Sequence, residues 1–143
     1  MNEIFVVNLA SAWFLTGLIW TIQVVHYPLF SLVGERFCDY EDRHKRRIGY
    51  IVGPVMTVEL AAAVLLVWRR PAYIPSWIAA LSFGLVVLIW ISTAALQAPC
   101  HQKLSQGFDA ATERRLTTTN WLRTAAWTLR ALLLTVALAD RLR

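Results

Sequence analysis

Residues 4–30 form one long apolar stretch, IFVVNLASAWFLTGLIWTIQVVHYPLF, that contains no Asp, Glu, Lys or Arg. About 20 mostly apolar residues are enough for a helix to cross the hydrocarbon core of a bilayer. Three further stretches meet this requirement, at about residues 48–68, 74–98 and 120–139. We therefore expect the 143 residues to form a single all-α domain with four membrane-spanning helices, and their short connections favour an integral membrane four-helix bundle.

The composition points to the same class of protein. Hydrophobic residues make up 57% of the chain and charged residues 16%, against about 45–50% and about 25% in soluble domains. A domain this small has too few polar side chains to cover its surface in water. The net charge of +5 would favour nucleic acid as a partner of a soluble protein, but here the basic residues gather at the membrane edges, where anionic lipid head groups lie. We expect the lipid bilayer, and no nucleic acid, as the partner of this chain.

Four spans place both termini on one side of the membrane, called side A. Residues 31–47 and 98–119 then lie on the opposite side, called side B. Side B carries more basic residues than side A, which predicts that side B is cytoplasmic and that both termini are periplasmic. The side B residues are Arg36, Arg43, Lys45, Arg46, Arg47, Lys103, Arg114 and Arg115, against Arg69, Arg70, Arg141 and Arg143 on side A.

The two side B segments differ in their expected structure. The first, residues 31–47, is dense in charge and is expected to extend the second span outward as a helix. The second, residues 104–119, is expected to form a separate short helix that begins at an Asp109 cap. Cys38 and Cys100 both lie on this side, where a cytoplasmic location predicts reduced thiols.

The first and third spans resemble each other. Leu18-Ile19-Trp20 recurs as Leu88-Ile89-Trp90, and each copy is followed by a glutamine, a proline and a histidine near side B. The pattern predicts two repeated helical hairpins in the same orientation, related by an axis along the membrane normal. Chance is the alternative, because apolar spans resemble one another without common ancestry.

Polar side chains within the spans concentrate towards side B. They occur in pairs three or four residues apart, which puts both members of a pair on one helix face. The pairs are Gln23 with His26, His44 with Arg47, Gln97 with His101, and Asn120 with Arg123. Because polar residues within spans usually face the bundle interior, we expect a histidine-containing cavity open to side B. The candidate catalytic residues are His26, His101 and Glu59, supported by Asn120 and Arg123.

Two charged residues lie deeper than the others. Counting at about 1.5 Å per residue places Glu59 and Arg130 roughly 15 Å from the side B edge, near the middle of the bilayer. A lone charge there costs at least a few kcal/mol, so we expect an ion pair between the two. The pair either fixes the packing of the helices or supplies a carboxylate for proton transfer.

The histidines allow four interpretations. They form hydrogen bonds at the level of the lipid head groups, or His26, His44 and His101 bind a transition metal such as Fe, Zn or Cu. Alternatively, His26 and His101 are the axial ligands of haem b, with Arg47 or Arg123 on its propionates. The fourth interpretation needs no cofactor: His26 or His101 acts as an acid or base on a lipid-soluble substrate, with Asn120 and Arg123 binding negative charge. Trp20, Trp90, Trp121 and Trp127 would then line an aromatic pocket.

Several motifs together resemble those of a known group of proteins. They are His26-Tyr27-Pro28-Leu29-Phe30, His44 to Arg47, Pro54-Val55-Met56 with Glu59, Pro99 with His101, and Asn120-Trp121-Leu122-Arg123-Thr124 with Trp127. The chain resembles small four-span proteins of the bacterial inner membrane over almost its whole length. The resemblance implies that location and implies no activity.

We expect a small membrane-embedded enzyme that applies redox or acid–base chemistry to a hydrophobic small molecule on the cytoplasmic side. The alternative is a non-enzymatic membrane subunit or a small carrier that forms a homo-oligomer, in which the same polar residues only hold the helices together.

Overall fold

The computed structural model describes residues 3–142, and all of its regular elements in this range are helices. Four apolar helical stretches are long enough to cross a membrane: Glu3–Leu32, Gly34–Trp68, Ser76–Leu104 and Ala110–Leu142. Their elements are α1 (Glu3–Thr21), η1 (Ile22–His26), η2 (Tyr27–Leu32), η3 (Gly34–Arg36), α2 (Phe37–Trp68), α3 (Ser76–Ser92), η4 (Thr93–Gln97), α4 (Ala98–Leu104) and α5 (Ala110–Leu142). The predicted all-α membrane bundle is confirmed, and the chain is a multi-pass membrane protein.

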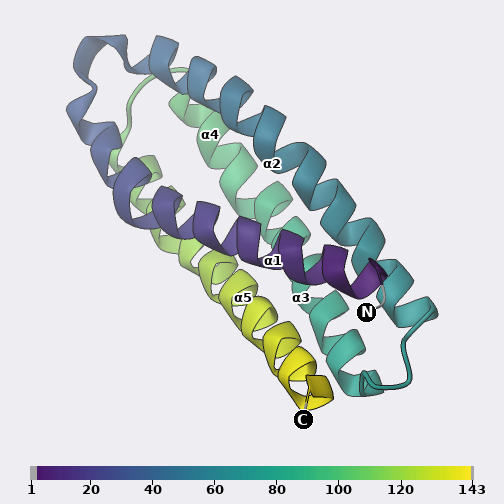
Figure 1. Ribbon diagram of the computed structural model, residues 1–143. Coiled ribbons are helices and arrows are strands. Elements are labelled where there is room, and N and C mark those ends of the chain that lie inside the picture. The colour runs from purple at the N-terminus through teal and green to yellow at the C-terminus, as the bar shows by residue number, and fades with distance from the viewer. Residues whose placement is uncertain (1–2, 143) are drawn as a thin grey trace.

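The long helices pack in a closed ring (Figure 1). Helix α1 contacts α2 and α5, and α3 contacts the same two helices from the other side. Both marked chain ends lie at the end of the bundle where residues 69–75 connect α2 to α3. The opposite end, side B, holds the two other connections.

The side B segments follow one expectation and depart from another. Helix α2 begins at Phe37, so the charged segment does extend the second span as predicted. The separate short helix expected in residues 104–119 is wrong, because α5 runs without interruption from Ala110 to Leu142. The predicted Asp109 cap is present: its carboxylate accepts a hydrogen bond from the backbone N–H of Thr112 at 3.1 Å. No Gly or Pro follows within α5, so nothing in the sequence ends the helix early.

Helices α1 and α3 both change geometry before they reach side B. Each passes into a π-helical turn, η1 after α1 and η4 after α3, and a proline follows shortly in the next element. Because proline lacks a backbone N–H and cannot continue the normal ladder, a wider turn accommodates it. The same spacing in sequence separates η1 from η4 and Pro28 from Pro99. This match supports the predicted duplication, which remains a prediction.

The interior consists of two apolar clusters with polar side chains between them. Leu15, Phe30, Phe37, Met56, Ile89 and Trp127 belong to the cluster towards side B. Phe5, Leu66, Ile74, Ile78 and Leu134 belong to the cluster towards side A. Large apolar side chains such as Trp13, Tyr50 and Trp68 also point outward and are exposed, as expected for a surface in contact with lipid tails.

Candidate functional site

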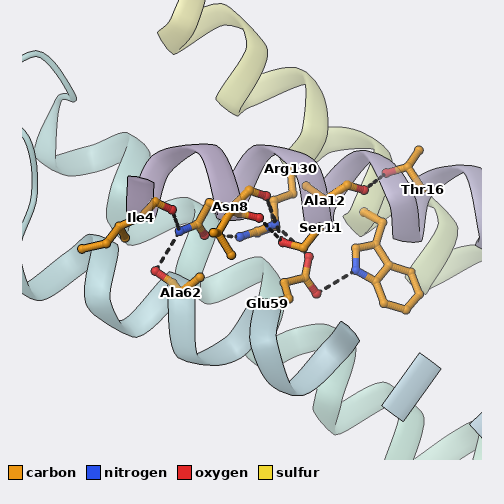
Figure 2. Close-up of polar contacts among 10 residues, drawn as sticks. Ile4, Asn8, Ser11, Ala12, Thr16, Glu59, Ala62 and Arg130 are labelled. Atoms are coloured by element: carbon orange, nitrogen blue, oxygen red, sulfur yellow. Dashed lines mark hydrogen bonds and ion pairs between the residues drawn. The ribbon is translucent and has the colours of Figure 1, made fainter. Parts of the chain in front are cut away.

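A fully buried polar cluster links α1, α2 and α5 where the two apolar clusters meet, and we call its members, Asn8, Glu59, Trp127 and Arg130, the deep polar cluster (Figure 2). The guanidinium of Arg130 donates to Glu59 Oε1 at 2.7 Å and to Asn8 Oδ1 at 2.6 Å. The second oxygen of Glu59 accepts a hydrogen bond from the indole N–H of Trp127 at 3.0 Å. Asn8 donates in turn to the backbone carbonyl of Ala62. The predicted Glu59–Arg130 ion pair is therefore confirmed, and both carboxylate oxygens are occupied.

A second polar cluster lies near side B and joins α2, α4 and the start of η2. Glu41 is fully buried, and its Oε1 lies 2.5 Å from Nδ1 of His101. The other ring nitrogen of His101, Nε2, lies 3.1 Å from the hydroxyl of Tyr27. A carboxylate only accepts hydrogen bonds, so His101 donates from Nδ1 and is left with Nε2 as an acceptor for Tyr27. Among the described residues, Glu41 Oε2 is buried and has no hydrogen-bond partner.

The two other histidines adjoin this chain of hydrogen bonds. His26 Nε2 and His44 Nδ1 are 2.8 Å apart, and the hydroxyl of Tyr40 lies 3.5 Å from the second nitrogen of His26. The rings of His44 and His101 are 5.8 Å apart between centroids. We call Tyr27, Glu41, His26, His44 and His101 together the side B cluster.

A cavity of about 460 Å³ opens beside the side B cluster, between α2 and the segment from α3 to α4. This volume lies within the range of about 300–1,000 Å³ typical of small-molecule sites. Tyr27, His44 and His101 contribute polar atoms to its wall, and Arg123 of α5 lines it as well. Much of the remaining wall is apolar and includes Ile22, Ile48, Val52, Met56 and Trp90.

The structure separates the predicted catalytic residues into two groups. His101 and Arg123 line the cavity, and His26 reaches it only through His44. Glu59 belongs to the deep polar cluster, and Asn120 is buried in the core, where it donates a hydrogen bond to Gln23 at 2.8 Å. Neither of these two lines the cavity.

The residues predicted to bind a cofactor are divided between the cavity and a neighbouring hollow. Arg47 lines a second hollow with His26 and His44, and this hollow shares His44 and Ile48 with the cavity. Within residues 3–142, no group of three or more His, Cys, Asp or Glu side chains is arranged to hold a metal ion. The nitrogens of His26 and His101 already face hydrogen-bond partners, so haem or metal ligation would require these bonds to be exchanged.

The four tryptophans expected around a pocket are divided between different places. Trp90 lines the cavity, whereas Trp20 and Trp121 pack edge to face at 5.5 Å and line an outer groove of α1 and α5. Trp127 lies beneath Arg123, whose guanidinium carbon is 5.1 Å from the indole centroid.

Sequence reasoning missed Glu41 and the hydroxyl of Tyr27. Glu41 stands in a run of charged residues, which usually form a solvated face. The signal that singles it out is its spacing from His44: three residues apart, the two side chains share one face of α2. Tyr27 had a weaker signal, its position next to His26 at the end of the first span.

A comparison with protein-family models, curated proteins and solved structures found no match. The fold and the polar clusters therefore define the class of protein: a four-span membrane protein with a cavity near one end of the bundle, partly lined by polar side chains.

Proposed function

We propose that this protein is a small membrane-embedded enzyme that performs acid–base chemistry on a hydrophobic molecule bound in the cavity beside α2. The single observation that carries this proposal is the chain Glu41–His101–Tyr27, in which a buried carboxylate orients an imidazole whose other nitrogen faces the hydroxyl of Tyr27, and both His101 and Tyr27 line the cavity. A base held by a third group in this way is typical of enzymes that move protons. A purely structural histidine needs no such arrangement beside an apolar cavity.

In the proposed reaction, His101 is the general base. Glu41 fixes the proton on Nδ1 and stabilises the imidazolium that forms when Nε2 takes a proton. The proton comes from the substrate directly or through the hydroxyl of Tyr27, which contacts Nε2 and belongs to a residue that also lines the cavity. The positive charge of Arg123 favours negative charge on the substrate after the proton has left.

Deuterium uptake tests this proposal without knowledge of the substrate. Purified protein in nanodiscs is incubated in D₂O with a hydrophobic metabolite extract, and mass spectrometry finds compounds that gain deuterium or change mass. We expect His101→Gln and Glu41→Gln to slow this reaction by a factor of about 10²–10⁴, the usual contribution of a general base. Arg114→Gln is the control, because Arg114 is exposed and lies away from the cavity.

Two outcomes would overturn the proposal. Equal rates in the wild type and in His101→Gln would remove His101 as the base. A compound that binds to the wild type but leaves it unchanged in mass and isotope content would favour the alternative, a carrier.

Cofactor binding by His26, His44 and His101, with Arg47 or Arg123 on haem propionates, remains a prediction with a direct test. Haem b bound by His26 and His101 would give the purified protein a Soret band, and a transition metal would give stoichiometric metal content. His26→Ala or His101→Ala would abolish either signal. If the purified protein is active but colourless and metal-free, acid–base chemistry without a cofactor is the interpretation that remains.

We also propose that the membrane is the bacterial inner membrane and that side B faces the cytoplasm. The excess of Lys and Arg on the side B segments supports this orientation. An alkaline phosphatase fused to the C-terminus should then be active, and an inactive fusion would reverse the assignment.

A further inference from the structure

Arg123 is a buried cation without an anion. Only 7% of its surface is exposed, and within residues 3–142 it makes no hydrogen bond or ion pair. Its guanidinium carbon lies 5.1 Å from the centroid of the Trp127 ring, and Tyr27 lies close enough to interact with it electrostatically, but neither side chain is an anion at neutral pH. Arg130, on the same helix, shows the usual arrangement, because it pairs with Glu59 and Asn8. Burial of a charge without a counter-charge is costly, so the position of Arg123 calls for an anion that is not part of the chain.

The cavity is the place from which that anion would approach. Arg123 lines it together with Tyr27 and His101, and apolar side chains of α2 form the opposite wall. Gly49 and Gly53 also belong to this wall, and a Cβ atom added at either position would meet open space. The α2 part of the lining is therefore mostly apolar and has room for an apolar body, and Arg123 is the group that would hold a charged end.

The charge of the site limits the kind of anion. Of the basic side chains in the lining, Lys45 already pairs with Asp42 at 3.1 Å, which leaves one guanidinium. One guanidinium neutralises a monoanion, and its fork of N–H groups matches the two oxygens of a carboxylate. A phosphate dianion would need a second cation.

We propose that the cavity binds a hydrophobic carboxylate, with its carboxylate on Arg123 and its apolar body along Ile48, Val52 and Met56. The assignment rests on the proposed function, since the carboxylate is the anionic group of that enzyme's substrate. It places the reacting proton near His101 and Tyr27, at a position on the molecule within reach of both.

Decanoate is the probe, since it carries one carboxylate on an unbranched apolar chain. Its binding to the protein in nanodiscs of zwitterionic lipid is measured by calorimetry at alkaline pH, with empty nanodiscs subtracted. Hydrogen bonds to charged groups contribute about 1.5–3 kcal/mol, so Arg123→Gln should weaken binding about ten- to a hundredfold. Methyl decanoate, which has no charge, should bind weakly to both proteins, and Arg123→Lys should keep part of the affinity.

Two further variants test the cavity itself. Gly53→Leu should narrow the cavity and weaken decanoate binding, and the added Cβ meets no atom within 4 Å. Gly84→Leu is the matched control: Gly84 also lies in a spanning helix, and a Cβ added there also meets no atom within 4 Å, but it does not line the cavity. Loss of binding in Gly53→Leu alone ties the site to the cavity even if Arg123→Gln fails to fold.

The outcomes separate this assignment from the proposed enzyme. A wild type that binds decanoate through Arg123 but catalyses no deuterium uptake would overturn the enzyme and leave the carboxylate site. Equal binding of decanoate by the wild type and by folded Arg123→Gln would overturn the carboxylate site, as would equal affinity for methyl decanoate. Tighter binding of decyl phosphate than of decanoate would replace the carboxylate with a phosphate.

Discussion

The deep polar cluster and the side B cluster are built around the same element, a fully buried glutamate on α2, yet their surroundings differ. Glu59 has both oxygens occupied and is fully buried where three helices meet. Glu41 has one oxygen bound to His101 and one with no partner among the described residues, and its partner histidine lines a cavity. A carboxylate with both oxygens paired holds helices in register, whereas a half-paired carboxylate whose partner lines a cavity leaves atoms available for another molecule.

The difference suggests that stability and activity are divided between the two glutamates. Glu59 connects α2 to α5, and through Arg130 and Asn8 to α1. Glu41 connects α2 to the short helix α4. We therefore expect changes in the deep polar cluster to lower the free energy of unfolding and changes in the side B cluster to lower activity.

The largest effect on stability is expected for Glu59→Gln. The substitution keeps the shape of the side chain but leaves the charge of Arg130 buried without a counter-charge, and breaking such a pair costs about 3–5 kcal/mol. Unfolding in mixed micelles, followed by circular dichroism, measures the loss. Arg130→Leu added in the same background should recover part of it, because the unpaired cation is then gone.

Two results would break the comparison between the clusters. Strictly additive effects in the double variant would mean that Glu59 and Arg130 do not interact. A folded Glu59→Gln variant without activity would make Glu59 part of the reacting site and not of the scaffold.

A smaller loss of stability is expected for Trp127→Phe. The change removes the indole N–H that donates to Glu59, and a hydrogen bond to a charged group contributes about 1.5–3 kcal/mol. Decanoate affinity provides the second measurement, since Trp127 also lies beneath Arg123. Stability should fall further than affinity; the reverse order would assign Trp127 to the cavity.

Tyr27→Phe is the counterpart in the side B cluster. It removes one neutral hydroxyl from His101 Nε2, which lowers the free energy of unfolding by only about 0.5–1.5 kcal/mol. The rate of deuterium uptake should fall by a larger factor, because in the proposed reaction the hydroxyl passes the proton to the base. A pH–rate profile that keeps its shape while its height drops would show that Tyr27 relays the proton and that His101 remains the base. An unchanged rate would limit Tyr27 to packing.

The two clusters also differ in how well the sequence predicted them. The Glu59–Arg130 pair followed from counting along regular helices, because a fixed rise per residue places both charges at one depth. The four spans followed from hydrophobicity, which dominates the choice between water and lipid.

The side B cluster was harder to predict because its geometry depends on departures from regular helices. The turns η1, which ends at His26, and η4, which ends at Gln97 ahead of His101, change the rotation of the chain at these residues. The burial of Glu41 depends on α4 packing back against α2, which no local pattern encodes. Asn120 shows the same limit: it was expected to act with Arg123, but it points to Gln23, whereas Arg123 lines the cavity.

The smallest effect is expected at Asp109, which belongs to neither cluster and joins α4 to the start of α5. Hydrogen bonds from Lys103 and from Thr112 lower the pKa of this carboxyl to about 2. Because its pKa in the folded protein is below its usual value of about 3.9, its contribution to stability is present above that value and is lost as the pH falls towards 2. Asp109→Asn should thus be slightly less stable than the wild type at neutral pH, and the difference should vanish in acid. Asp140→Asn, near the other end of α5, is the control. Asp109 helps to hold α4, which carries His101, so any change in activity that accompanies Asp109→Asn should appear in the rate of deuterium uptake and not in the deep polar cluster. A difference in stability that persists at pH about 2 would show that Asp109 acts through packing and not through its charge.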